Sequence, residues 1–231
     1  MSIFKTKNYR GYRIKVEVEQ DQALLEHYNP RKQTTLGTMA CSHGSYELGD
    51  WQISKHVIRE HSNWREIADW LEDTRDATNL IPLYLYDHSG ITMQTGPFRS
   101  RWDSGQVGYI YTTEEDIEKY KEGFESMDGL SAEDLDVNER LEEEVKLYDH
   151  FISGEVFRYA IEGERGRQVD SCSGFLGMDW EENGLMERAR GAVDREIKNR
   201  KETRWEKLKA LIREGVGLNH REDILRGYPA R

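Results

Sequence analysis

Two aspartates and a histidine stand next to two short apolar stretches of the sequence. Asp87 and His88 follow the apolar and aromatic residues 82–86, and Asp103 precedes the apolar residues 107–112. If these stretches form neighbouring strands, the two carboxylates and the imidazole meet at one edge of a sheet. Such a set can hold a divalent cation or share acid–base work in a hydrolytic reaction. We therefore expect Asp87, His88 and Asp103 to be the catalytic residues if the chain is an enzyme.

The same sequences are also typical of turns, because an Asp side chain before Ser-Gly commonly bonds the backbone two residues on. A further alternative is that the loops of residues 87–106 form a polar pocket that sequesters a small ligand or a nucleotide. The residues that we expect to bind such a ligand are Ser89, Trp102, Ser104, Gln106, Asp170 and Cys172.

The two cysteines, Cys41 and Cys172, are too far apart in the sequence to suggest a disulfide framework. Cys172 could be a nucleophile if it meets His88 or His43. Core packing is the more common role of a free cysteine. The sequence has neither the ligand spacing of a zinc site nor a glycine-rich phosphate loop. We expect no metal and no cofactor.

Hydrophobic periodicity indicates which elements must position these side chains. Apolar and charged residues alternate over 12–19, which predicts a half-buried strand. Further strands are expected at 36–43, 82–86, 91–95, 107–112, 155–162 and 168–176. Helices are expected to begin at Asn63, Thr113 and Ser131, and a long helix is expected over 179–214.

This order of elements predicts an α+β fold: a mainly antiparallel sheet with inserted helices and a long C-terminal helix. We expect a core domain of residues 1–178 with an acidic helical insert at about 114–153. Residues 179–231 would form a C-terminal helical extension.

The formal net charge is −11, but the charge is unevenly distributed. Residues 114–149 hold fifteen Asp and Glu against four Lys and Arg, whereas residues 186–231 hold thirteen Lys and Arg against eight Asp and Glu. The acidic total argues against direct contact with nucleic acid. The acidic segment is either a solvated helical face or a surface for a partner with a basic groove. In the second case we expect Glu139, Glu142, Glu143 and Glu144 to contact that partner.

The chain has no apolar run of about 18 residues, so we expect no membrane span. Its first residues lack the apolar core of a signal peptide, which suggests a cytosolic protein. We expect a monomer or a simple homo-oligomer.

Residues 83–93 and 102–108 together resemble the central block of a group of uncharacterised proteins encoded by bacteriophages and prophages. Residues 29–31, 36–39 and 170–175 also resemble that group, so the similarity covers most of residues 10–176. The resemblance implies no activity. It implies a phage accessory protein that acts in a bacterial cytosol. The acidic insert and the C-terminal helix match the group less clearly.

We therefore expect a phage-type accessory protein that binds a host component through acidic surface contacts. A nucleic-acid-handling or defence complex would be such a component, and binding would inhibit it. The alternatives are the hydrolytic enzyme and the ligand-sequestering module described above.

Overall fold

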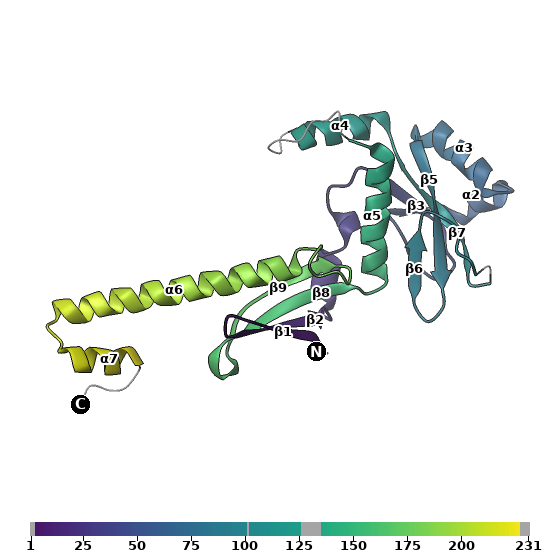
Figure 1. The fold of residues 1–231 in the computed structure, drawn as a ribbon. Helices are drawn as coiled ribbons and strands as arrows, with labels where there is room; N and C mark the ends of the chain where they lie inside the picture. The colour runs from purple at the N-terminus through teal and green to yellow at the C-terminus, as the bar shows by residue number, and fades with distance from the viewer. Residues whose placement is uncertain (1–2, 101, 126–134, 227–231) are drawn as a thin grey trace. The chain divides into compact units, whose positions relative to one another are not determined.

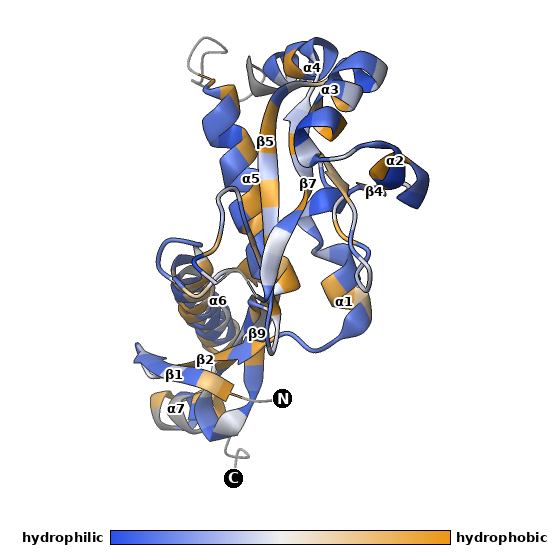
Figure 2. Cartoon of the chain, turned by 90° about the vertical axis from the view of Figure 1, so that its right-hand side faces the viewer, coloured by the Kyte–Doolittle hydropathy of each residue, from blue (hydrophilic) through white to orange (hydrophobic). Residues whose placement is uncertain are grey.

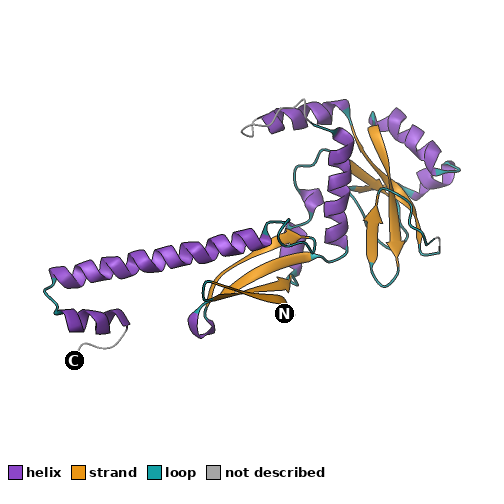
Figure 3. Cartoon of the chain, viewed as in Figure 1, coloured by secondary structure: helices purple, strands orange, loops and turns teal. Residues whose placement is uncertain are grey.

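The computed structural model describes residues 3–100, 102–125 and 135–226, which form two compact units. Unit 1 contains the described residues of Met1–Val18, Phe157–Phe175 and Asp179–Arg231, and unit 2 contains those of Glu19–Val156 and Leu176–Met178. This division differs from the expected boundary after residue 178, because the long C-terminal helix belongs to the same unit as the N-terminal strands. The α+β class predicted from the sequence is confirmed (Figure 3).

Unit 1 is built on a four-stranded sheet in the order β1-β2-β8-β9. The alternation over residues 12–19 produces the expected strand, in which Ile14 and Val16 are buried and Arg13 is exposed. Glu17 departs from the pattern, because it is buried although the alternation places it on the solvent face. Strand β2 pairs antiparallel with β1 on one side and with β8 on the other. The strands are β1 (Ile3–Tyr9), β2 (Tyr12–Val18), β8 (Val156–Glu162) and β9 (Gln168–Leu176), and η3 (Glu164–Gly166) joins the last two.

The long helix α6 (Leu185–Arg213) covers this sheet with its first half only. Leu185, Met186, Ala189, Ala192 and Val193 are buried against the apolar side chains of β2 and β8. The helix begins at 185 and not at 179, because residue 184 is a glycine with a left-handed backbone. Its second half extends beyond the sheet, and α7 (Leu218–Arg226) folds back beside it (Figure 1).

Unit 2 is built on a five-stranded sheet in the order β4-β3-β7-β5-β6. The β3–β4 pair is parallel and the other neighbouring strands are antiparallel. The hairpin expected around residues 89–90 is confirmed as the β5–β6 connection. The strands are β3 (Thr38–Cys41), β4 (Trp51–Gln52), β5 (Thr78–Asp87), β6 (Ile91–Gln94) and β7 (Ser104–Thr112).

Helices cover both faces of this sheet. Consecutive strand residues face opposite sides, and each side has its own apolar cluster packed against a helix. On one face, Leu141, Val145 and Tyr148 of α5 pack with buried side chains that include Leu83 and Ile110. On the other face, α3 buries Ile67 and Leu71 against side chains of β3 and β7. The described helices of unit 2 are α1 (Gln22–His27), η1 (Pro30–Lys32), α2 (Lys55–Glu60), α3 (Trp64–Arg75), α4 (Glu114–Glu125) and α5 (Val137–Ile152).

Two helix starts were predicted correctly from capping residues. The Asn63 side chain accepts a hydrogen bond from the Glu66 backbone N–H, and the Glu66 carboxylate accepts one from the Ser62 N–H. The Thr113 hydroxyl accepts a hydrogen bond from the Asp116 N–H. The helix start expected at Ser131 lies outside the described residues.

Candidate functional site

The structure brings His88 and Asp103 together at one end of the unit 2 sheet. Strand β5 ends at Asp87 and the antiparallel strand β7 begins at Ser104, so the Asp87 N–H donates to the Asp103 carbonyl at 2.8 Å. His88 Nδ1 lies 3.7 Å from Asp103 Oδ2. The two stretches therefore form neighbouring strands, which was the condition for these side chains to meet.

The Asp87 side chain has a different partner, because its Oδ1 accepts a hydrogen bond from the Tyr46 hydroxyl at 3.3 Å. The negative charge of Asp87, together with burial, raises the pKa of Tyr46. The side chains of His88 and Asp103 are 66% and 42% exposed. Among the described residues, no three His, Cys, Asp or Glu side chains are arranged to hold a metal ion. The arrangement is a solvated His–carboxylate pair beside a Tyr–carboxylate pair.

The residues expected to bind a ligand mostly make local turn contacts. The Ser89 hydroxyl donates to the His88 carbonyl, the Ser104 hydroxyl donates to the Ser100 carbonyl, and Gln106 Nε2 donates to the Gly108 carbonyl. Trp102 is 96% exposed. A surface hollow of about 470 Å³ lies beside them, but its lining is Tyr86, Gln94, Pro97, Phe98, Arg99 and Ser100.

Asp170 and Cys172 lie on β9 in unit 1, whereas the loops of residues 87–106 belong to unit 2. Cys172 packs against the core of unit 1, and Asp170 accepts a hydrogen bond from the Ser171 N–H. Burial and then the charges of Asp170 and Cys172 raise the pKa of the neighbouring Tyr159 to about 12. In unit 2, burial raises the pKa of Cys41 to about 12, so this thiol is protonated at neutral pH and poorly suited to nucleophilic attack.

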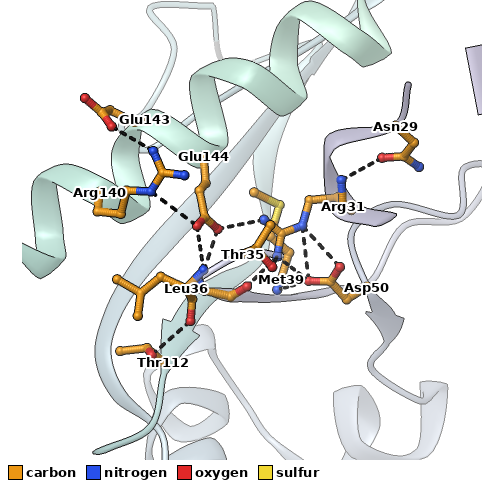
Figure 4. Close-up of polar contacts among 11 residues, drawn as sticks. Asn29, Arg31, Thr35, Leu36, Met39, Asp50, Thr112, Arg140, Glu143 and Glu144 are labelled. Carbon is orange, nitrogen blue, oxygen red and sulfur yellow. Dashed lines mark hydrogen bonds and ion pairs between the residues drawn. The ribbon is translucent and has the colours of Figure 1, made fainter. Parts of the chain in front are cut away.

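A buried ion cluster that was not predicted from the sequence lies elsewhere in unit 2 (Figure 4). Arg31 Nη2 lies 2.6 Å from Asp50 Oδ2, and Arg31 Nη1 lies 2.9 Å from Glu144 Oε2. The side chains of Arg31 and Glu144 are only 3% and 2% exposed. Burial disfavours the guanidinium charge, but the bonds to Asp50 and Glu144 prevail and raise the pKa of Arg31.

The carboxylates of this cluster also bind backbone groups. Glu144 accepts hydrogen bonds from the N–H groups of Leu36 and Gly37, and Asp50 accepts one from the Met39 N–H. The cluster therefore ties α5, the start of β3 and the loop before β4 together. All three charges are paired and hydrogen-bonded, which is the pattern of a structural ion cluster.

The expectation that Glu144 contacts a partner was wrong, because its carboxylate is buried. Glu144 stands three residues after Leu141 and four before Tyr148, so helical spacing places it on the buried face. The burial of Glu144 could have been predicted from this spacing. The other three glutamates, Glu139, Glu142 and Glu143, are exposed.

We call Glu139, Glu142 and Glu143 the α5 acidic face. The opposite side of the same helix is fixed in the core by Leu141, Val145 and Tyr148. Figure 2 shows hydrophilic and hydrophobic residues recurring along α5. Glu143 pairs with Arg140 at 3.1 Å, whereas Glu139 and Glu142 make no ion pair within the described part of the chain. Helix α4 adds further exposed carboxylates, Glu114, Glu115, Glu118 and Glu122.

Comparisons with protein-family models, with curated proteins and with solved structures give no match to this chain. Within the described residues, every helix is too short or too polar to cross a lipid bilayer.

Proposed function

We propose that this chain is a phage-type accessory protein that binds a basic surface of a host component through its α5 acidic face. The observation that carries this proposal is the exposure of Glu139, Glu142 and Glu143 on a helix whose other side is packed into the core. A packed helix holds its charges in fixed positions, so little conformational entropy is lost when a partner binds.

Electrostatics gives this surface a role in association. Exposed charges act over about 8–10 Å at cell-like ionic strength, so the carboxylates attract a basic partner before contact. Attraction of this kind raises the association rate more than it lowers the dissociation rate. The exposed carboxylates of α4 belong to the same unit and add to its negative potential.

The two alternatives have less support. A hydrolytic centre needs a positioned acid–base set, but the His88–Asp103 pair is solvated and Asp87 bonds Tyr46. A sequestering pocket needs polar groups that converge on one cavity, but Ser89, Ser104 and Gln106 bond neighbouring carbonyls.

The test compares two triple variants of the full chain. In the first, Glu139, Glu142 and Glu143 are replaced by Gln. In the control, three exposed carboxylates on α2 and α3 are neutralised in the same way: Glu60→Gln, Glu72→Gln and Asp73→Asn. Both variants change the net charge equally, and all three helices, α2, α3 and α5, lie in unit 2.

The partner is first captured from an extract of the bacterial host with the wild-type chain, and its association rate is then measured at several salt concentrations. We expect the first variant to associate about tenfold more slowly at low salt and with a flatter salt dependence. The control should keep the wild-type rate within about twofold. Equal rates for wild type and first variant would reject the proposal.

A further inference from the structure

A polar groove lies in unit 1 along the middle of α6, the long helix of Figure 1. It has a volume of about 410 Å³. One wall is the face of α6 between Glu196 and Lys207, Arg167 approaches from the turn between β8 and β9, and Leu225 approaches from α7.

The lining of this groove is strongly basic. Arg200, Arg204 and Lys207 recur at spacings of four and three residues, so they form a row on one face of the helix. Arg167 adds a fourth positive charge. Helix α6 as a whole carries ten Lys and Arg against five Asp and Glu, so its own surroundings are basic.

Two of these cations are already partly neutralised. Glu196 lies 2.9 Å from Arg200 and 3.6 Å from Arg167, and Glu164 lies 3.9 Å from Arg200. By contrast, Arg204 and Lys207 have no carboxylate partner among the side chains that the structure describes. The groove therefore presents the positive charges of Arg204 and Lys207, which no described carboxylate of unit 1 neutralises through an ion pair.

The lining indicates the chemistry of the ligand. The wall from Glu196 to Lys207 is three helical turns, or about 16 Å, which is longer than a single phosphate group needs. Asn199 and Thr203 add hydrogen-bonding groups. Among the lining residues that the structure describes, only Leu225 is apolar, so an apolar peptide would find little to bind. Arg, Lys, Asn and Thr are the side chains that typically contact nucleic-acid phosphates.

We propose that this groove binds the phosphate backbone of duplex nucleic acid without reading its sequence. A duplex is favoured over a single strand because the described lining residues include no aromatic ring, and unstacked bases need such rings to stack on. Guanidinium groups can bind phosphates through two parallel hydrogen bonds.

The acidic net charge of the chain led to the expectation of no direct contact with nucleic acid, and this proposal departs from that expectation. Charges separated by more than about 8 Å are largely screened at physiological ionic strength, so the local charge of the groove governs the contact. The proposal is also independent of the α5 acidic face, because the two surfaces belong to different units.

The test is binding of the full chain to a fluorescently labelled 20-base-pair DNA duplex, measured by anisotropy at salt concentrations from 50 to 200 mM. If about three phosphates are contacted, the affinity should fall about 40-fold over this range. A second duplex of unrelated sequence should bind equally well. The double variant Arg204→Gln/Lys207→Gln should bind at least tenfold more weakly at 50 mM salt, and its salt slope should fall by about two.

The matched control is Lys198→Gln/Lys201→Gln, which removes the same charge from an exposed face of α6 outside the groove. Glutamine is a good helix former, and circular dichroism should show unchanged helix content in both variants. We expect the control to keep wild-type affinity within about threefold. Absence of duplex binding by the wild type, equal loss in both variants, or equally strong competition by poly-glutamate would each overturn the proposal.

Discussion

Arg31 holds two carboxylates of unit 2 in a buried ion cluster. It is almost completely removed from water between Asp50 and Glu144, and its guanidinium also donates to the Gly37 carbonyl. The attraction within a buried ion pair is largely offset by the desolvation of both partners. Removing one partner is nevertheless strongly destabilising, because the other charge stays buried.

We therefore expect Arg31→Met to lower the free energy of unfolding by about 3–5 kcal/mol. The neighbouring Lys32 is the matched control, because its ion pair with Glu26 is exposed. Lys32→Met should cost at most about 1 kcal/mol. Urea denaturation of both variants measures the difference, and similar costs for the two would show that the cluster adds no stability.

A second prediction concerns the buried thiol of Cys41, whose pKa is raised from 9.0 to about 12 by burial. Because the folded state disfavours the thiolate, the stabilisation is fully present below pH 9 and is lost as the pH rises towards 12. Tyr159, raised from 10.0 to about 12, adds to the same alkaline loss. Denaturant unfolding between pH 8 and 11 should therefore show falling stability in the wild type.

The Cys41→Ala variant isolates the contribution of the thiol. Its free energy of unfolding should fall less steeply above pH 9 than that of the wild type, because the remaining loss comes from other groups. Parallel pH profiles for the two proteins would contradict this assignment.

At the scale of elements, strand β7 depends on a close backbone approach. Its register with β5 shifts between Leu83 and Tyr84, and Val107 packs in the same core cluster as Ile110. One residue later, Gly108 lies against β3: a Cβ atom there would be 2.0 Å from the Ala40 carbonyl oxygen. Only a glycine allows the two strands to approach so closely.

Gly108→Ala should therefore lower the free energy of unfolding by about 3 kcal/mol, the upper part of the range for overpacked sites. Gly105→Ala on the same strand is the control, because a Cβ atom there meets nothing within 4 Å. We expect that variant to stay within about 1 kcal/mol of the wild type. Thermal melts of both variants measure the difference in stability. Equal melting temperatures would show that β3 and β7 can move apart freely.

The elements that could be predicted from the sequence are those with a one-sided burial pattern. Strand β2 alternates because one face is buried, and α3 was found from its capping box at Asn63 and Glu66. Strand β1 gave no such signal, since Ile3 to Asn8 are all exposed and the strand is held by pairing with β2. Short helices such as α1 bury no residue and were missed for the same reason.

Candidate sites could be predicted only where a local sequence pattern places their residues. The meeting of His88 and Asp103 was predictable, because both flank strands that pair with each other. The ion cluster was missed because the run of glutamates was taken as one solvated face, although helical spacing separates Glu144 from Glu142. The groove on α6 depends on Arg167 in a distant turn, which no local pattern could place.

At the scale of the whole molecule, unit 2 is an insertion between two strands of unit 1. Val18 at the end of β2 pairs with Phe157 near the start of β8, and the chain between them forms almost all of unit 2. Directly opposite residues of antiparallel strands have Cα atoms about 4.5–5.5 Å apart, so a tight turn can join them.

Replacing residues 19–156 by Asn-Gly should therefore leave unit 1 able to fold, with β2 and β8 joined as a hairpin. We expect a cooperative thermal melt and a circular dichroism spectrum rich in helix from α6. The control joins the same strands with the same two residues but carries Ile14→Asp, which places a charge in the buried core. A broad, non-cooperative melt of the first protein would show that unit 1 needs unit 2.

The pairing of β2 with β8 also sets the order in which a nascent chain can fold on the ribosome. At about 5–20 residues per second, β8 is synthesised roughly 7–30 s after β2. During this time β1 and β2 form at best a marginal two-stranded hairpin, whose open edge carries Arg13 and Lys15, and such charges discourage wrong pairing. All five strands of unit 2 emerge within this interval. In a chain stalled on the ribosome with residue 178 just outside the exit tunnel, unit 2 should therefore already be protected from protease. At that stage β1 and β2 are not yet covered by α6, which is still to be synthesised or inside the tunnel.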